Sequence, residues 1–437
     1  MQRSRNGRSA ESDGNAAAGV SNPRARQRAL AIGVLERAPD EEPLGELKEL
    51  LRTAGVATAG EMVQQRVKPD PDRYFGAGKL TELKQQVASS DANLVACDDE
   101  LAPRQERNLE AALGVPVIDR TAVILDIFAD HAHSADGKLQ VELAQLEYNL
   151  ARMRGLWTHL ERLGGGIGTR GPGESQIETD RRLARDRIAA LRRRLARLRR
   201  TRDVMRTRRE QTSTPTVALA CYTNAGKSTL LNAITGAEVE VGERLFETLD
   251  PTTRRFEQHG RRYLLTDTVG FIEKLPHQLV EAFKATLEET VLADLILHVV
   301  DASAPAERRE ATMAAVDEVL EEIGAGESPR LLVFNKADLL SEEERGEAVL
   351  GHPDAILVSA LSGEGIDELR EGIERAFEET LREVELLVPY SEGARLHELH
   401  ELAGELERTD RSDGVLVRAR VPAAELHRFM DLSINDR

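Results

Sequence analysis

The sequence predicts an α/β protein: an N-terminal parallel α/β unit, a long helical hairpin, a second α/β unit and a small α+β C-terminal domain. Three observations predict this class. Short apolar runs alternate with helical patterns on both sides of the hairpin, which is typical of parallel sheets with crossover helices. Two long stretches of helical periodicity surround a glycine-rich segment. The length of 437 residues allows about two to four domains.

The N-terminal unit, residues 28–136, contains predicted strands with amphipathic helices between them. We expect strands at Ala29–Leu35, Leu94–Cys97 and Val115–Ile118, and helices at Leu44–Ala54 and Ala102–Leu113. The preceding residues 1–27 are rich in Arg, Ser, Gly and Ala and lack the apolar core of a secretory signal. We expect a disordered tail there, and a transit peptide is the alternative.

The hairpin is predicted over residues 137–212. Helical periodicity runs from Lys138 to Leu163 and resumes from Glu174 to Arg209. Between them, six of the ten residues Gly164–Gly173 are glycine, and such a run cannot hold a helix. The two helices are therefore expected to pack antiparallel, with the glycines at the tip.

The second α/β unit, residues 213–385, starts in a linker and continues into alternating strands and helices. Its predicted strands are Thr216–Cys221, Arg262–Thr266, Leu295–Val300, Arg330–Phe334 and Ile356–Ser359. The C-terminal segment, residues 386–437, contains a predicted helix at Glu392–Glu407 and a strand at Gly414–Val421. It is too short to form a robust domain alone.

Charge is distributed unevenly along this acidic chain. The net charge is −17, yet Arg181–Arg209 contains 14 arginines and two aspartates, a local charge of +12, so the remainder carries −29. The negative net charge argues against a protein that simply coats nucleic acid. The basic stretch, however, can contact a polyanion by releasing counterions. The alternative is a solvated arginine-rich helix that packs on the acidic remainder.

Composition excludes other classes of protein. No apolar run approaches the roughly 18 residues that a membrane-spanning helix needs. The two cysteines, Cys97 and Cys221, cannot form a disulfide framework or a thiolate zinc site. We therefore expect a cytoplasmic protein with no integral membrane segment.

A phosphate-binding loop follows the predicted strand Thr216–Cys221. It consists of Cys221, Tyr222, Thr223, Asn224, Ala225, Gly226, Lys227 and Ser228. Such a loop needs inward N–H groups, a lysine for the β- and γ-phosphates and a hydroxyl for Mg²⁺, which Lys227 and Ser228 supply. Cys221 stands where the pattern has a glycine, and a cysteine fits without strain if its φ is negative.

A second loop, which follows the predicted strand Arg262–Thr266, consists of Asp267, Thr268, Val269 and Gly270. Its aspartate can hold the Mg²⁺ shell through water, and the N–H of Gly270 can meet a γ-phosphate.

Two further loops predict the base. One consists of Asn335, Lys336, Ala337 and Asp338, and the other of Ser359, Ala360 and Leu361. The carboxylate of Asp338 can accept two hydrogen bonds from the N1/N2 edge of guanine, donors that adenine lacks, and the Ser359 loop can meet the guanine carbonyl. Four motifs in order, each at a strand end, favour a GTP site over four chance matches.

A candidate switch segment lies between the first two loops. It begins with Phe246, Glu247, Thr248, Leu249 and Asp250 and continues to Arg254. A switch must supply Mg²⁺ with a hydroxyl that is released after hydrolysis. Thr248, Thr252 and Thr253 are candidates, and their spacing does not choose among them. An ordinary turn at Asp250-Pro251 is the alternative.

Two residues bear on the rate of hydrolysis. Phe271 follows Gly270 at the position where many GTPases carry a water-orienting glutamine, so we expect slow intrinsic hydrolysis that a partner or cation stimulates. The amide oxygen of Asn224 can hold a K⁺ ion beside the phosphates, and a loop-stabilising role is the alternative. The candidate catalytic groups are Lys227, Gly270 and Asn224.

These motifs together resemble the HflX family of translational GTPases. Within the second α/β unit the resembling segments are Thr223–Thr229, Phe246–Thr252 and Asp267–Ile272. Before it they are Tyr74–Lys79, Asp119–Thr121, Ile124–Ala129, Gly137–Leu146 and Gly164–Glu174. The resemblance covers residues 28–385, and its glycine run is long enough to be specific.

The resemblance implies a P-loop GTPase domain at residues 213–385. It implies a GTP hydrolase that binds GTP, GDP and the large (50S) ribosomal subunit and couples its nucleotide cycle to splitting or rescue of ribosomes. Mg²⁺ would be bound by Ser228 and, by similarity, Thr248, with Thr252 as second choice, and K⁺ is a further candidate ion.

The RNA-contact candidates come from the glycine tip and the basic stretch. They are Gly164, Gly165, Gly166, Arg170, Arg192, Arg193 and Arg194. We expect a monomer. The alternative function is a GTP-regulated scaffold that binds a protein partner with negligible turnover. An ATPase driven by the N-terminal unit is disfavoured, because that unit has no complete phosphate loop.

Overall fold

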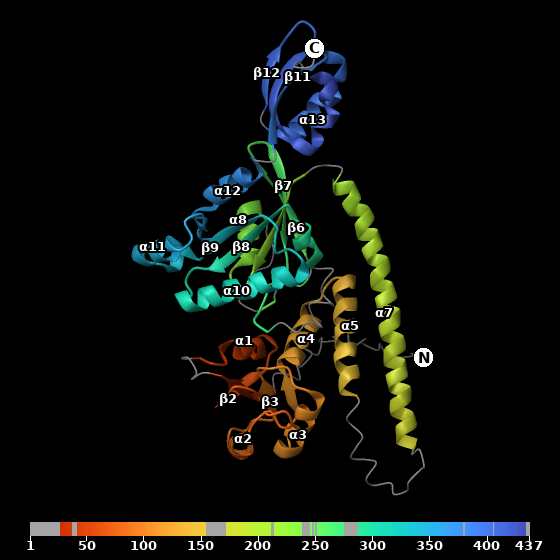
Figure 1. Cartoon of the computed structure of the whole chain (residues 1–437), viewed down its shortest axis with the longest axis vertical. Coiled ribbons are helices and arrows are strands. Elements are labelled where there is room, and N and C mark those ends of the chain that lie inside the picture. The colour runs from red at the N-terminus through yellow and green to blue at the C-terminus, as the bar shows by residue number, and fades with distance from the viewer. Residues whose placement is uncertain are drawn as a thin grey trace, which may run out of the picture.

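The computed structural model describes residues 27–36, 42–153, 172–210, 214–237, 245–246, 249, 251–274, 287–378, 381–404 and 406–433. Three sheets follow one another along the long axis of the molecule, with the N-terminal sheet at the bottom of Figure 1 and the C-terminal sheet at the top. The predicted α/β class is confirmed.

The N-terminal sheet is parallel and has the strand order β2-β1-β3-β4. Its strands are β1 (Arg28–Leu35), β2 (Ala57–Gln65), β3 (Leu94–Cys97) and β4 (Val117–Asp119), and its helices are α1 (Gly45–Thr53), α2 (Ala77–Ser89), α3 (Pro103–Leu113) and α4 (Arg120–His131). Strand β2 and helices α2 and α4 are absent from the prediction. Strand β2 is an edge strand with mostly exposed or half-buried side chains, so it lacks the apolar run that marks a buried strand.

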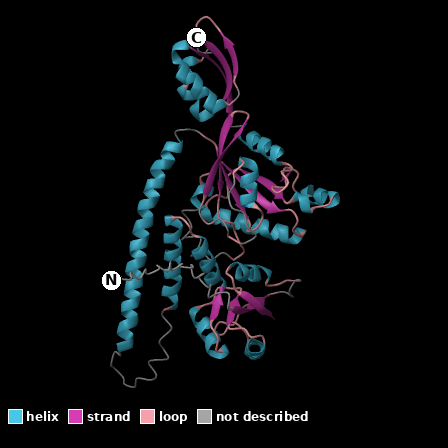
Figure 2. Ribbon diagram, turned by 180° about the vertical axis from the view of Figure 1, so that it is seen from behind, coloured by secondary structure: helices cyan, strands magenta, loops and turns pink. Residues whose placement is uncertain are grey.

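The helical hairpin consists of α5 (Ala135–Arg152) and α7 (Pro172–Glu210), which lie side by side in Figures 1 and 2. Leucines of α5 interlock with Ile188 and Leu191 of α7, as the predicted apolar stripe requires. Helix α5 ends before the predicted Leu163, and residues 154–171, including the glycine run up to residue 171, lie outside the described part. Helix α7 begins at Pro172, an acceptable first residue because proline lacks only an N–H that has no helical partner.

The second α/β unit contains a sheet of order β10-β9-β8-β5-β7-β6, in which only β6 is antiparallel to its neighbour. Its strands are β5 (Thr216–Cys221), β6 (Thr252–Gln258), β7 (Arg261–Asp267), β8 (Leu295–Asp301), β9 (Arg330–Asn335) and β10 (Ile356–Leu357). The helices are α8 (Lys227–Thr235), α10 (Ala306–Ile323), α11 (Glu342–Leu350) and α12 (Ile366–Glu378). All five predicted strands are present, although β10 is shorter than predicted.

The C-terminal sheet is antiparallel, with the order β11-β13-β12 and helix α13 packed on it. Its elements are β11 (Leu381–Val388), α13 (Gly393–Ala403), β12 (Glu407–Asp410) and β13 (Val415–Pro422). The predicted helix Glu392–Glu407 is wrong at its C-terminal end, because Glu407 begins a strand. Strand β11 crosses the predicted boundary at residue 386. An ion pair of 2.6 Å between Arg262 and Glu401 joins α13 to β7.

Short 3₁₀ helices at Ala337–Leu339, Tyr390–Glu392, Ala423–Arg428 and Met430–Leu432 complete the described elements. Among the helices that the structure describes, none combines the length and apolar character needed to cross a membrane.

Candidate functional site

The loops predicted to bind nucleotide meet at one edge of the six-stranded sheet. They follow β5, β7, β9 and β10, which run parallel, so their carboxyl ends lie together. In open α/β sheets this edge is where ligands bind.

The phosphate loop passes from β5 into α8 through Gly226. This residue has φ of 89°, and a side chain on it would collide with the amide of Asn335. That amide donates to the carbonyl oxygen of Ala225 at 2.8 Å, while its oxygen accepts the N–H of Ala360 at 2.9 Å. Asn335 therefore ties the phosphate loop to both predicted base-binding loops.

Lys227, Ser228 and Asp267 form a cluster at the start of α8. The ammonium of Lys227 forms an ion pair with Asp267, and the hydroxyl of Ser228 donates to the other carboxylate oxygen of Asp267 at 2.8 Å. Both Lys227 and Asp267 are buried. The N–H groups and dipole at this helix N-terminus favour an anion such as a phosphate.

The oxygen ligands of this cluster suit Mg²⁺, which proteins bind through one or two side chains and substrate phosphates. Ser228 and Asp267 supply such oxygens. Within the described ranges, no group of three or more His, Cys, Asp or Glu residues forms a metal cage. The donor set therefore fits a nucleotide-associated Mg²⁺.

Cys221 occupies the first position of the phosphate loop without backbone strain. It is the last residue of β5, its extended backbone pairs with Val299, and positive φ values are confined to other residues. Burial raises the pKa of its thiol to about 12, so the side chain is a neutral part of the core.

We expect a Cys221→Gly variant to bind GTP with unchanged affinity, within about twofold, because an extended backbone gives glycine no conformational advantage. It should unfold at a lower temperature, since removing a buried side chain leaves a cavity. Titration with a fluorescent GTP analogue and thermal unfolding check both effects. Much tighter GTP binding by the variant would instead reveal strain at Cys221.

The predicted base-binding loops are held by side-chain contacts. The carboxylate of Asp338 accepts a hydrogen bond of 2.5 Å from the hydroxyl of Ser359, and Lys336 forms an ion pair of 2.6 Å with Asp301. Lys336 has φ of 69°, and Leu361 is exposed. The structure thus brings Asp338 and the Ser359 loop together, and it adds Asp301, which belongs to none of the four sequence motifs.

The described residues of the candidate switch segment contact the N-terminal unit. Phe246 is buried and meets Phe128 of α4 edge-on, with ring centroids 4.7 Å apart. Its carbonyl oxygen accepts a hydrogen bond of 2.8 Å from Nδ1 of His131. Glu247, Thr248 and Asp250 lie outside the described residues. The side chain of Phe246 packs on the N-terminal unit, and its place in the nucleotide site stays a prediction.

The two other threonines of that segment lie in β6. Thr252 is paired with Asp267 across the β6–β7 ladder, and the hydroxyl of Thr253 is 3.0 Å from that of Thr266. Thr252 is therefore next to the Mg²⁺-type cluster, whereas Thr253 is engaged in a cross-strand hydrogen bond.

The loop after β7 lies directly against the phosphate loop. A Cβ on Gly270 would be 3.1 Å from Cγ2 of Thr223, so a side chain there would require Thr223 to shift. Phe271 exchanges backbone hydrogen bonds with Cys221 and Thr223, and its ring is buried against residues of β8 and α10. Phe271 is therefore part of the core, and slow intrinsic hydrolysis stays a prediction.

The RNA-contact candidates fall into two groups. Gly164, Gly165, Gly166 and Arg170 lie outside the described residues. Arg192 forms an ion pair of 2.8 Å with Glu147 of α5, while Arg193 and Arg194 are exposed on α7. Part of the basic stretch therefore pairs with acidic side chains of α5, as expected for an arginine-rich helix that packs on the acidic remainder. The other part faces outward.

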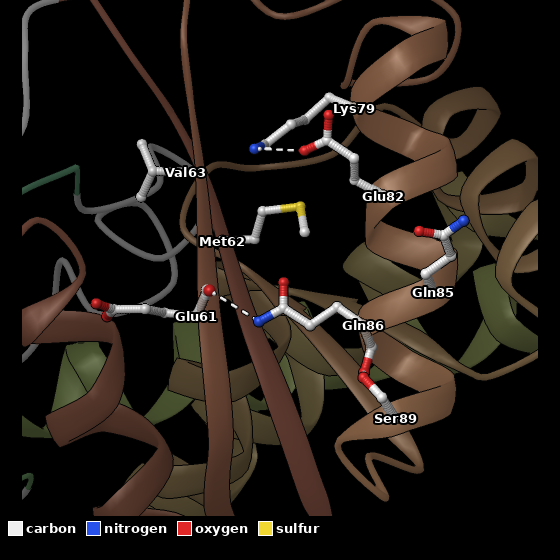
Figure 3. A pocket seen from close by; sticks show the side chains of 8 residues that line it. All are labelled: Glu61, Met62, Val63, Lys79, Glu82, Gln85, Gln86 and Ser89. Atoms are coloured by element: carbon white, nitrogen blue, oxygen red, sulfur yellow. Dashed lines mark hydrogen bonds and ion pairs between the residues drawn. The ribbon is translucent and has the colours of Figure 1, made fainter.

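A cavity of about 600 Å³ lies away from these loops, between the edge strand β2 and helix α2 (Figure 3). Part of its polar lining is paired, because Lys79 contacts Glu82 at 2.9 Å and Gln86 donates to the carbonyl of Glu61 at 3.2 Å.

The fold and the loops at its sheet edge define a P-loop GTPase. Three families match successive parts of the chain. Residues 41–129 match the family described as "GTP-binding GTPase N-terminal", and residues 131–209 match the one described as "GTP-binding GTPase Middle Region". Residues 216–336 match the family described as "50S ribosome-binding GTPase". The chain belongs to the HflX family of GTPases and hydrolyses GTP.

Close relatives cover nearly the whole chain. GTPase HflX of Caldanaerobacter subterraneus subsp. tengcongensis is 46% identical over 94% of this chain and 95% of that protein. GTPase HflX of Escherichia coli K12 is 44% identical over 89% of this chain and 92% of that protein. Among solved structures, a GTP-binding protein from Sulfolobus solfataricus in complex with GDP is 24% identical over 80% of this chain and 98% of that chain, with a TM-score of 0.41.

Proposed function

We propose that this GTPase binds the large (50S) ribosomal subunit and couples GTP binding and hydrolysis to splitting or rescue of ribosomes. The observation that carries the proposal is the match of residues 216–336 to the family described as 50S ribosome-binding GTPases. The outward-facing arginines of α7 support it, because they offer a cationic surface to RNA phosphates. We propose that the protein acts as a monomer in the cytoplasm, the compartment of ribosomes.

The proposed reaction is in-line attack of water on the γ-phosphate. Lys227, the N–H of Gly270 and the backbone N–H groups of the phosphate loop stabilise the charge that develops on the transferred group. Mg²⁺, when bound, supplies neutralisation of the phosphate oxygens, and Ser228 together with Asp267 would hold it.

Three site assignments remain part of this proposal. Thr248 is the proposed switch ligand of Mg²⁺, and Thr252 is the second choice, supported by its pairing with Asp267. Asn224 is the proposed K⁺ ligand, and it is an exposed residue of the phosphate loop with φ of 64°. The buried Phe271 supports slow hydrolysis in the absence of the ribosome.

Sedimentation of purified 50S subunits with the full chain and a non-hydrolysable GTP analogue tests the proposal. We expect cosedimentation with the analogue, and faster GTP hydrolysis when 50S subunits are added. A hydrolysis rate unchanged by 50S subunits would overturn the proposal and favour the scaffold reading.

A variant pair tests the role of α7. Arg193→Gln/Arg194→Gln should weaken 50S binding by about tenfold at low salt and flatten its salt dependence, because two phosphate-facing charges are lost. GTP affinity should not change. The matched control Arg308→Gln/Arg375→Gln removes two exposed charges from the GTPase domain. Equal weakening in both pairs would show only a net-charge effect.

A further inference from the structure

An arginine of α11 contacts both of the loops that are predicted to bind the base. The guanidinium of Arg345 donates to the carbonyl oxygen of Ala337 at 2.9 Å. It also forms a two-pronged ion pair with the carboxylate of Glu364, with N–O distances of 2.5 and 3.2 Å. Ala337 directly precedes Asp338, and Glu364 follows the Ser359 loop. A residue outside the four sequence motifs therefore joins the two base-binding loops.

The same two loops are joined a second time, at the predicted base contact itself. The hydroxyl of Ser359 donates to the carboxylate of Asp338 at 2.5 Å. The N–H of Ser359 donates to the carbonyl oxygen of Glu364 at 2.9 Å, which links the Ser359 loop back to the partner of Arg345. The contacts therefore form a closed ring, whose members are Arg345, Ala337, Asp338, Ser359 and Glu364.

Burial separates the carboxylate of this ring from its frame. Asp338 is exposed, whereas its neighbours in the ring, Ala337 and Ser359, are buried. A ligand can therefore reach the carboxylate while the residues beside it stay packed. The preceding Lys336 is held separately, by its ion pair with Asp301. Loss of Arg345 would thus remove one support of Asp338 and leave the rest of the loop in place.

The start of α11 sets the position of Arg345. The hydroxyl of Ser341 accepts the N–H of Glu344 at 3.4 Å, and the carboxylate of Glu344 accepts the N–H of Ser341 at 2.8 Å. This reciprocal cap begins the helix directly after the base loop. The backbone N–H of Arg345 donates to the carbonyl oxygen of Ser341 at 3.0 Å, one turn into the helix. From there its planar guanidinium has the fork geometry that pairs with a carboxylate through two nitrogens.

We propose that Arg345 and Glu364 are positioning residues that hold the carboxylate of Asp338 in place for the 2-amino group of guanine. The inference rests on the predicted role of Asp338 in base binding. A carboxylate that is already held loses less conformational freedom when the base binds, so more of the hydrogen-bond energy appears as affinity. Selectivity is a difference between two affinities, so it falls when the contact that distinguishes the two bases is loosened.

The test compares the affinities of GDP and inosine diphosphate (IDP), whose base lacks the 2-amino group, in the full chain. Competition against a fluorescent GDP analogue measures both affinities, and their ratio reports the hydrogen bond between that amino group and Asp338. For Arg345→Met we expect the GDP-to-IDP affinity ratio to fall at least about threefold, because Asp338 is less firmly held. The lost positive charge acts on both diphosphates alike and cancels in the ratio.

Arg330→Met is the matched control. The side chain of Arg330 is 27% exposed, against 23% for Arg345, and it likewise pairs with a carboxylate, that of Asp317, and donates to a backbone carbonyl, that of Gly326. It lies at the opposite end of β9 from the base loop, so this variant should keep the parent ratio.

A double-variant cycle tests whether the ion pair acts as a unit. Glu364→Gln alone should lower the ratio about as much as Arg345→Met, and the two changes together should lower it little further. An unchanged ratio in Arg345→Met, an equal fall in Arg330→Met, or independent effects in the cycle would each overturn the proposal.

Asp338→Ala distinguishes this inference from the base assignment on which it rests. That variant should lose the preference for GDP over IDP. If it keeps the parent ratio, the base assignment and the inference are both wrong. If it loses the preference while Arg345→Met keeps the parent ratio, the inference alone is wrong. The measurement needs neither hydrolysis nor ribosomes, so its outcome is independent of the proposed ribosomal function.

Discussion

Lys227→Ala is expected to lower GTP affinity by at least about a hundredfold, because charge-assisted hydrogen bonds to the β- and γ-phosphates are lost. The lysine lies at the N-terminus of α8, where the backbone alone gives a weaker anion site. Titration with a fluorescent GTP analogue measures the loss. Normal GTP affinity in this variant would contradict the assignment of the phosphate loop.

A second variant separates binding from folding. Lys227 neutralises the fully buried Asp267, so its removal alone also destabilises the domain. In Lys227→Ala/Asp267→Asn the buried charge is gone, and we expect stability to recover while GTP affinity stays low. The control Lys79→Ala removes a lysine from an exposed ion pair with Glu82 and should leave GTP affinity unchanged.

Arg120→Met is expected to lower the free energy of unfolding by about 3–5 kcal/mol. Arg120 is buried, and its loss leaves Glu46 and Asp98, which it contacts at 2.7 and 2.8 Å, without their shared cation. Urea denaturation of the parent and variant measures the difference. Arg52→Met removes an exposed ion pair with Glu49 and should cost less than about 1 kcal/mol. Similar small costs for both variants would show that Arg120 does not stabilise the N-terminal unit.

The loss caused by Arg120→Met should depend on pH. Burial, opposed by the charge of Arg120, raises the pKa of Glu46 above the ordinary 4.5. A carboxyl group with a raised pKa holds its proton in the folded state at pH values where the unfolded chain has released it, so stability falls as pH rises through that pKa. Without Arg120 this pKa rises further. The deficit should therefore be larger at pH 8 than at pH 5, and a pH-independent deficit would exclude Glu46 as its source.

Local sequence patterns predicted those parts of the molecule that depend on neighbouring residues. Strands β3 and β5 begin and end where their apolar runs do, since buried parallel strands need apolar side chains on both faces. The loops after β5, β7 and β9 were predicted for a similar reason, because each motif is continuous in sequence.

Features that depend on distant residues were not predictable in this way. Arg120 donates a hydrogen bond to the carbonyl of Glu273, 153 positions away, and Lys274 donates one to Asp98, 176 positions away. No spacing rule connects such groups, and only the family resemblance singles out the segment Asp119–Thr121. Strand β2 was missed because its exposed edge permits Gln, Glu and Thr where a buried strand would carry valine or isoleucine.

Helix α7 has a mechanical consequence. Its 39 residues form an uninterrupted rod of about 58 Å, and the linker to β5 follows directly at its C-terminal end. A continuous helix has a fixed rise per residue and does not shorten or extend. Each residue added to it would lengthen the reach by about 1.5 Å and turn the outward arginines by about 100°. The length of α7 therefore sets both the distance that it spans and the direction in which its outward arginines point.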